Sequence, residues 1–127
     1  MNINNVTLGG RLTRDPELRF TASGLAQCTF SIAQNNRRKE DNEWVDGDTY
    51  FFDAVCWRAL AENTAELQKG DLIVIVGRLQ QRSWETDSGE RRSKIEIVAE
   101  DVTLSRKWAA KEASRTTPDY GPGEEPF

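Results

Sequence analysis

The chain has 127 residues, of which 37% are hydrophobic and 30% are charged. This composition supports one compact domain and excludes a collagen-like or wholly disordered chain. The longest strongly apolar run, residues 72–76, is far shorter than the roughly 20 residues that a membrane helix needs. The first residues also lack the basic and apolar regions of a signal peptide, so we expect a cytosolic protein without a membrane partner.

The sequence lacks the residues of the commonest catalytic and metal sites. It has no histidine, and its two cysteines, Cys28 and Cys56, are too far apart for a metal-binding or redox pair. Both lie in apolar, strand-like segments, so we expect two buried thiols. No phosphate-binding loop, nucleophile elbow or dinucleotide fingerprint is present. We therefore expect no enzyme, no cofactor and no metal, with a metal-dependent nuclease as the best alternative from the enzyme class.

The distribution of charge matters more than the net value of −4. All 17 basic residues lie within residues 1–115, together with 18 of the 21 acids. The last 12 residues carry Asp119, Glu124 and Glu125 and no base. The body is therefore nearly neutral, and a polyanionic partner depends on whether its bases share one face.

Hydrophobic periodicity and turn residues predict the elements. In chain order, we expect strands over residues 6–12, 18–21, 25–34 and 48–57, a helix over 59–68, and strands over 71–84 and 91–104. Residues 35–47 predict a long polar hairpin loop, and the Gly- and Pro-rich end predicts a domain over 1–108 followed by a flexible tail over 109–127. We interpret the pattern as all-β with one short helix: a five-stranded OB-fold barrel with the helix between its third and fourth strands. Such barrels usually bind oligonucleotides or oligosaccharides.

The strand over residues 48–57 carries the first candidate site residues. Its small and apolar set, Tyr50, Phe52, Ala54 and Cys56, is expected to face the core. The other set then faces outward, with Phe51 and Trp57 about 20 Å apart as points on which bases could stack. The opposite assignment, in which Phe51 and Trp57 are core residues, stays open from the pattern alone.

The next two strands and the polar loop add candidate cations. Arg78, Arg82 and Trp84 share one face of their strand, and Arg92 and Lys94 extend that face, while the nearby acids are expected only at the hairpin tip. The loop adds Arg37, Arg38, Lys39 and Trp44. The alternative for the sheet face is an ordinary exposed surface with interspersed ion pairs. The alternative for the loop is that its charges are merely solvated.

Several motifs resemble bacterial single-stranded DNA-binding proteins. They run in the same order as in that family and cover roughly residues 3–106: GRLTRDPELRFT at 10–21, WRALAEN at 57–63, LQKG at 67–70, VGRL at 76–79 and QRSWETDSG at 81–89. The chain looks closest to actinobacterial members or their phage-borne relatives. The family's stacking aromatics align with Phe51, Trp57 and Trp84. A fourth family tryptophan aligns near Arg38, and we expect Trp44 to take its place.

This resemblance implies a homotetramer of OB-fold barrels that binds single-stranded DNA, independently of sequence, in replication, recombination and repair. The family ends in an acidic tip with Pro-Phe last, and this chain ends Glu124, Glu125, Pro126, Phe127. The tip implies recruitment of replication and repair proteins, although this chain has fewer acids and a shorter linker. The alternative in the binding class is an OB module for RNA or for protein assembly.

Overall fold

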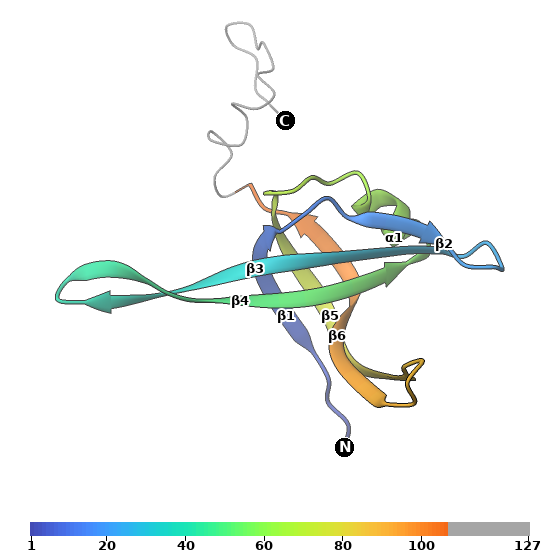
Figure 1. Ribbon diagram of the computed structural model, residues 1–127. Helices are drawn as coiled ribbons and strands as arrows, with labels where there is room; N and C mark the ends of the chain where they lie inside the picture. The colour runs from blue at the N-terminus through green and yellow to red at the C-terminus, as the bar shows by residue number, and fades with distance from the viewer. Residues whose placement is uncertain (107–127) are drawn as a thin grey trace, which may run out of the picture.

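Five strands close a barrel in the part of the chain that the structure describes, residues 1–106 of a computed structural model (Figure 1). The elements in chain order are β1 (Val6–Leu12), β2 (Glu17–Phe20), β3 (Ala26–Glu40), β4 (Glu43–Trp57), α1 (Arg58–Thr64), β5 (Leu72–Glu85) and β6 (Arg91–Leu104). The sheet has the order β1-β5-β6-β4-β3-β2, and an additional pairing of β1 with β3 closes the ring. The expected all-β fold with a five-stranded barrel and one short helix is confirmed.

The short strand β2 is not part of the closed ring. It pairs with the first four residues of β3, whereas β1 pairs with β3 further along, at Arg11–Ala33 and Leu12–Ile32. Among the five barrel strands the helix therefore lies between the third and the fourth, as the sequence predicts. Gly10 permits the closure, because a Cβ there would stand 2.7 Å from the carbonyl oxygen of Ala33.

The core follows the alternation that the sequence shows in β3. Every second residue from Ala26 to Ile32 is buried, and these side chains pack against inward residues of the other strands and the helix, chiefly Leu12, Ala54, Cys56, Ala61, Ile73, Ile75 and Ile97. Cys28 and Cys56 lie directly opposite each other on β3 and β4, and both are free and fully buried, as expected. The neighbouring Cys56 thiol and burial raise the pKa of Cys28 far above its ordinary value.

The helix is shorter than the predicted range of 59–68. It ends at Thr64, because the next amides bond three residues back: Glu66 N to Asn63 O at 3.2 Å and Leu67 N to Thr64 O at 3.0 Å. The Asp71 carboxylate then accepts the amide of Gln68 at 2.8 Å and fixes the turn into β5. Within residues 1–106 no helix is long and apolar enough to span a membrane.

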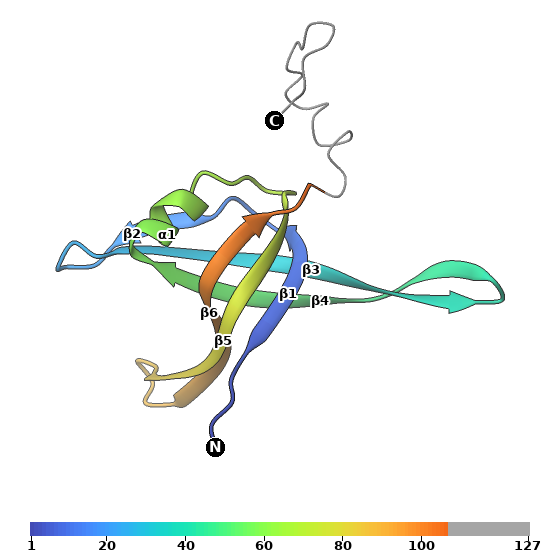
Figure 2. The ribbon, with the colours of Figure 1, turned by 180° about the vertical axis from the view of Figure 1, so that it is seen from behind.

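The prediction of a polar loop over residues 35–47 is wrong, because most of this segment is β-strand. β3 and β4 continue through this segment as a two-stranded ribbon that extends well beyond the barrel (Figures 1 and 2). Only Asp41 and Asn42 form the turn, and both have the positive φ that a tight hairpin turn requires, 48° and 65°. Charged residues dominate the sequence here, but backbone pairing with the partner strand sets the conformation. We call residues 36–47 the arm.

Candidate nucleic-acid interface

The structure places Phe51 and Trp57 on the outer face of β4. Phe51 is 67% exposed and Trp57 is half-buried, while Ala54 and Cys56 point into the core. Two expectations for this strand are wrong. Tyr50 is 44% exposed, since it lies where β4 leaves the barrel. Val55 has the outward alternation but is only 3% exposed, because both neighbouring strands flank it and Val98 pairs beside it.

A cleft of about 460 Å³ opens beside Trp57 on this outer face. Cross-strand pairing builds it, since Arg19 lies opposite Gln27 and Gln27 lies opposite Trp57. The cleft is lined by Arg19, Gln27, Thr29, Val55, Trp57, Gln80, Arg82 and Glu96. It therefore joins the aromatic residue of β4 to the arginine-bearing face of β5.

The β5–β6 pair brings the predicted cations together with Trp84. Register places Arg82 opposite Lys94 and Trp84 opposite Arg92, so these four side chains belong to one face. The guanidinium of Arg82 lies over the Trp84 ring, 4.7 Å from its centroid, and Trp84 is 38% exposed. Arg78 is also exposed and forms no ion pair with any other residue of 1–106.

Two acids stand within this basic surface, against the expectation that acids occupy only the hairpin tip. Glu96 Oε1 lies 3.4 Å from Arg82 Nε and accepts a hydrogen bond from Gln80 Nε2 at 3.1 Å. Asp53 of β4 forms an ion pair with Lys94 of β6. The Lys94 ammonium, with help from the Ser31 hydroxyl, lowers the pKa of Asp53 below its ordinary value. The surface is thus a mixed network in which arginine and lysine heads are held in place.

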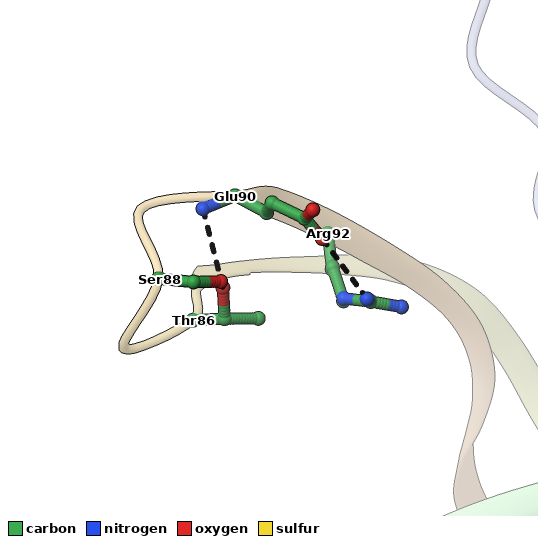
Figure 3. Close-up of polar contacts among 4 residues, drawn as sticks. All are labelled: Thr86, Ser88, Glu90 and Arg92. Atoms are coloured by element: carbon green, nitrogen blue, oxygen red, sulfur yellow. Dashed lines mark hydrogen bonds and ion pairs between the residues drawn. The ribbon is translucent and has the colours of Figure 1, made fainter.

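The hairpin tip between β5 and β6 engages Arg92 as well (Figure 3). Arg92 Nη2 lies 3.0 Å from Glu90 Oε2. The tip itself is closed by Thr86, whose hydroxyl accepts the Glu90 amide at 3.2 Å and bonds Ser88 at 3.0 Å. Arg92 therefore lies on the predicted face, but its charge is partly neutralised before any ligand arrives.

Lys94 lies at a second opening, between β4 and β6. These two strands pair only at Ala54–Ile97 and Val55–Val98 and then diverge. The gap is a cleft of about 440 Å³ lined by Phe51, Phe52, Asp53, Leu79, Lys94, Ile95, Glu96 and Ile97. The exposed ring of Phe51 thus stands beside a cation and an apolar wall, which suits a stacked base with its phosphate nearby.

The arm carries the remaining predicted residues. Arg37 Nε lies 3.5 Å from Asp46 Oδ1, and Arg38 Nε lies 3.2 Å from Glu40 Oε1. Lys39 makes no ion pair within residues 1–106. It lies opposite Trp44 in the register, and Trp44 is 63% exposed. The arm is therefore separate from the barrel face in space but continuous with it along β3 and β4.

Some residues of this surface were not predicted. Arg19 lines the Trp57 cleft, and Arg14 is close enough to Asp53 to lower its pKa further. Both lie in the motif at residues 10–21, and membership of that motif was the sequence signal that could have identified them. They lie at this surface because β2 and the end of β1 pack beside β3. The predicted tip, Glu124, Glu125, Pro126 and Phe127, lies outside the described residues. Within residues 1–106, no group of His, Cys, Asp or Glu side chains could hold a metal ion.

Comparison with known proteins identifies the family. The sequence model of the Single-strand binding protein family matches residues 3–105. The chain is 46% identical to a single-stranded DNA-binding protein of Paenarthrobacter aurescens, over 87% of this chain and 67% of that protein. Identity is 44% to one of Corynebacterium glutamicum, over 88% and 51%, and 39% to one of Mycolicibacterium smegmatis, over 88% and 70%. The chain thus spans about half the length of the Corynebacterium protein and about two thirds of the other two. It belongs to the Single-strand binding protein family.

Proposed function

We propose that this chain binds single-stranded DNA without sequence preference and does no chemistry on it. The observation that carries the proposal is the outer barrel face, where the exposed rings of Phe51 and Trp84 and the half-buried ring of Trp57 stand beside Arg82 and Lys94. Bases stack on aromatic rings regardless of sequence, and cations follow the phosphates, which are the two needs of a general single-strand binder. The family match and the names of the related proteins support the same ligand.

Arg78, Arg92, Arg37, Arg38 and Lys39 extend this track in the proposal, and Trp44 adds a stacking point. Arg82, Lys94 and most of these further cations have a carboxylate partner in the described residues. Phosphates must therefore compete with five acids, Glu96, Asp53, Glu90, Asp46 and Glu40. Exchange of one anion for another fits a protein that binds and releases DNA readily.

The testing experiment is a salt-titrated binding assay that compares oligo-dT with duplex DNA and RNA in the presence of Mg²⁺. The proposal expects tight binding to oligo-dT, quenching of tryptophan fluorescence, weaker binding as salt rises, and an intact oligonucleotide afterwards. Preference for RNA, binding to neither strand type, or cleavage of the DNA contradicts it.

The proposal includes a homotetramer. β1 supports this, since Val6–Gly10 pair only with β5 and leave their other edge unpaired within residues 1–106. Ile3, shortly before β1 in the chain, is 74% exposed, and Val76 is exposed on the adjoining strand β5. Val6, in contrast, packs against the core. Light scattering at micromolar concentration gives the mass of four chains if the proposal holds, and the mass of one chain if it fails.

We further propose that residues 1–108 form the DNA-binding domain and that the tip of residues 109–127 recruits proteins of replication, recombination and repair. A terminal Phe127 with its carboxylate, Glu124 and Glu125 suits a basic pocket with an apolar floor. Deletion of residues 119–127 should abolish partner binding and leave DNA affinity equal or slightly higher, most visibly at low salt. Partner binding that survives the deletion, or markedly weaker DNA binding, contradicts this division.

A further inference from the structure

The register of the β3–β4 pairing shifts by one residue between the barrel and the arm. On the barrel side, Asn35 lies opposite Thr49, and Thr49 Oγ1 donates to Asn35 Oδ1 at 2.9 Å. On the arm side, Arg37 lies opposite Asp46, with the ion pair at 3.5 Å. Both contacts show paired side chains sharing a face. Between them β3 advances two residues and β4 advances three, so β4 holds one extra residue in a bulge.

This extra residue decides which side chains of β4 share a face. In the barrel the odd-numbered residues of β4, Phe51 and Trp57 among them, are on the outer face, opposite Ala33 and Gln27. β3 alternates without interruption, so Arg37 and Lys39 stay on the face of Ala33. Their partners across the bulge are even-numbered, and Lys39 lies opposite Trp44. The bulge therefore moves Trp44 to the face that Phe51 and Trp57 occupy.

The two faces of the arm differ in charge. The face of Trp44 carries Arg37 and Lys39 with a single acid, Asp46. The other face carries Arg38 with two acids, Glu40 and Glu43, around the apolar Val45. Cations thus gather with the exposed indole on the outer face, and acids gather on the other.

Gly47 makes the bulge possible. A Cβ built on Gly47 would collide with the carbonyl oxygen of Asn36, which is backbone and cannot turn aside. The bulge therefore requires glycine at this position, and the requirement is one of close approach rather than of φ.

We propose that the bulge at Gly47–Asp48 is a positioning device that turns Trp44 to the DNA-binding face, beside Lys39 and Arg37 of β3, so that arm and barrel form one continuous track. The inference deepens the proposed function and rests on it. It makes Gly47 a positioning residue. It also narrows the proposed track in the arm to Arg37 and Lys39, because Arg38 lies on the other face, opposite Val45.

The test exchanges Trp44 and Val45, which are neighbours in β4 with opposite orientation. The double variant W44V/V45W keeps the composition and alters only arm side chains, but it moves the indole to the acidic face. We expect it to lose oligo-dT affinity as Trp44→Ala does, by roughly 5- to 150-fold, the loss of one stacked base, with a smaller number of nucleotides covered per protein. Affinity equal to that of the wild type would overturn the inference.

Gly47→Ala provides the reciprocal test, because a Cβ at this position collides with the carbonyl oxygen of Asn36 and opposes the bulge, so that β4 alternates regularly from Thr49 into the arm. Gly47→Ala alone should weaken binding like Trp44→Ala, because regular alternation moves Trp44 to the other face. Gly47→Ala combined with W44V/V45W should restore binding, since the relocated indole then lies on the outer face. A purely structural role for the bulge predicts no such rescue, so failure of a folded combined variant to recover affinity overturns the inference. Wild-type protein that does not bind oligo-dT at all would instead overturn the proposed function.

Discussion

The guanidinium of Arg82 lies over the indole of Trp84, 4.7 Å from the ring centroid, while its Nε faces Glu96 Oε1 at 3.4 Å. The carboxylate holds the arginine, and the arginine covers one side of the ring. A base can therefore stack on the other side of Trp84 with a cation already in place beside it.

Trp57→Ala and Trp84→Ala should each weaken binding to oligo-dT by about 1–3 kcal/mol, because each removes one stacking surface. Fluorescence titration of the full chain measures the loss. The fold should be retained, since Trp84 is exposed and Trp57 only half-buried. Circular dichroism is the control: native spectra with wild-type affinity reject the stacking role, and loss of the native spectrum shows that the rings support the core.

Arg78→Ala should reduce the slope of log affinity against log salt more than Arg82→Ala does. Arg78 makes no ion pair within residues 1–106, so its full charge is available to a phosphate, which corresponds to a change of about one in the slope. Arg82 already shares its charge with Glu96, so it releases fewer counterions on binding. Titrations at several salt concentrations measure both slopes. A larger change for Arg82→Ala would place the phosphate track through the Trp57 cleft instead.

Asp53→Asn should strengthen DNA binding at low salt, because it releases Lys94 from its ion pair and removes a negative charge from the face. Phe51→Ala, which should weaken binding, serves in the same assay as the reference for a loss of affinity. Unchanged or weaker binding by Asp53→Asn means that the ion pair orients Lys94 for DNA.

The same pair predicts a pH effect on stability. The folded-state pKa of Asp53 is lowered, so its contribution is present above the ordinary carboxyl pKa, about 4, and is lost as the pH falls through the lower folded-state value. Lys94→Met should return the Asp53 pKa toward the ordinary value in a carboxyl NMR titration. An Asp53 pKa that stays low in Lys94→Met would assign the shift to Ser31 and Arg14.

Cys28 and Cys56 should not react with a thiol reagent in the native protein and should both react in denaturant, since both side chains are fully buried and the thiolate of Cys28 is disfavoured. A colorimetric thiol assay with and without guanidinium distinguishes the two states. Rapid reaction under native conditions would show that β3 and β4 separate locally.

Local alternation was sufficient to predict the outer position of Phe51 and the buried positions of Cys28 and Cys56. It failed for Tyr50 and Val55, whose exposure depends on where β4 leaves the barrel and on Val98 of β6. The sequence predicts a loop for the arm because these residues lack the apolar alternation of a strand. Their extended conformation comes instead from backbone pairing between β3 and β4.

The acids within the basic face could not have been located from sequence. Asp53 and Lys94 lie far apart in the chain and meet because β4 and β6 run parallel for a short stretch. The orientation of Trp44 was equally hidden, since one extra residue at Gly47–Asp48 reverses the alternation that the sequence alone would extend.

The most direct test measures the oligo-dT affinities of two variants, Phe51→Ala and Tyr50→Ala, and compares them. It tests the central claim that one face of the barrel binds single-stranded DNA. The two aromatics are consecutive in β4 and both exposed, 67% and 44%, but alternation points them to opposite faces. The account predicts a loss of about 1–3 kcal/mol for Phe51→Ala and near-wild-type affinity for Tyr50→Ala. Equal losses, or a loss confined to Tyr50→Ala, would contradict it.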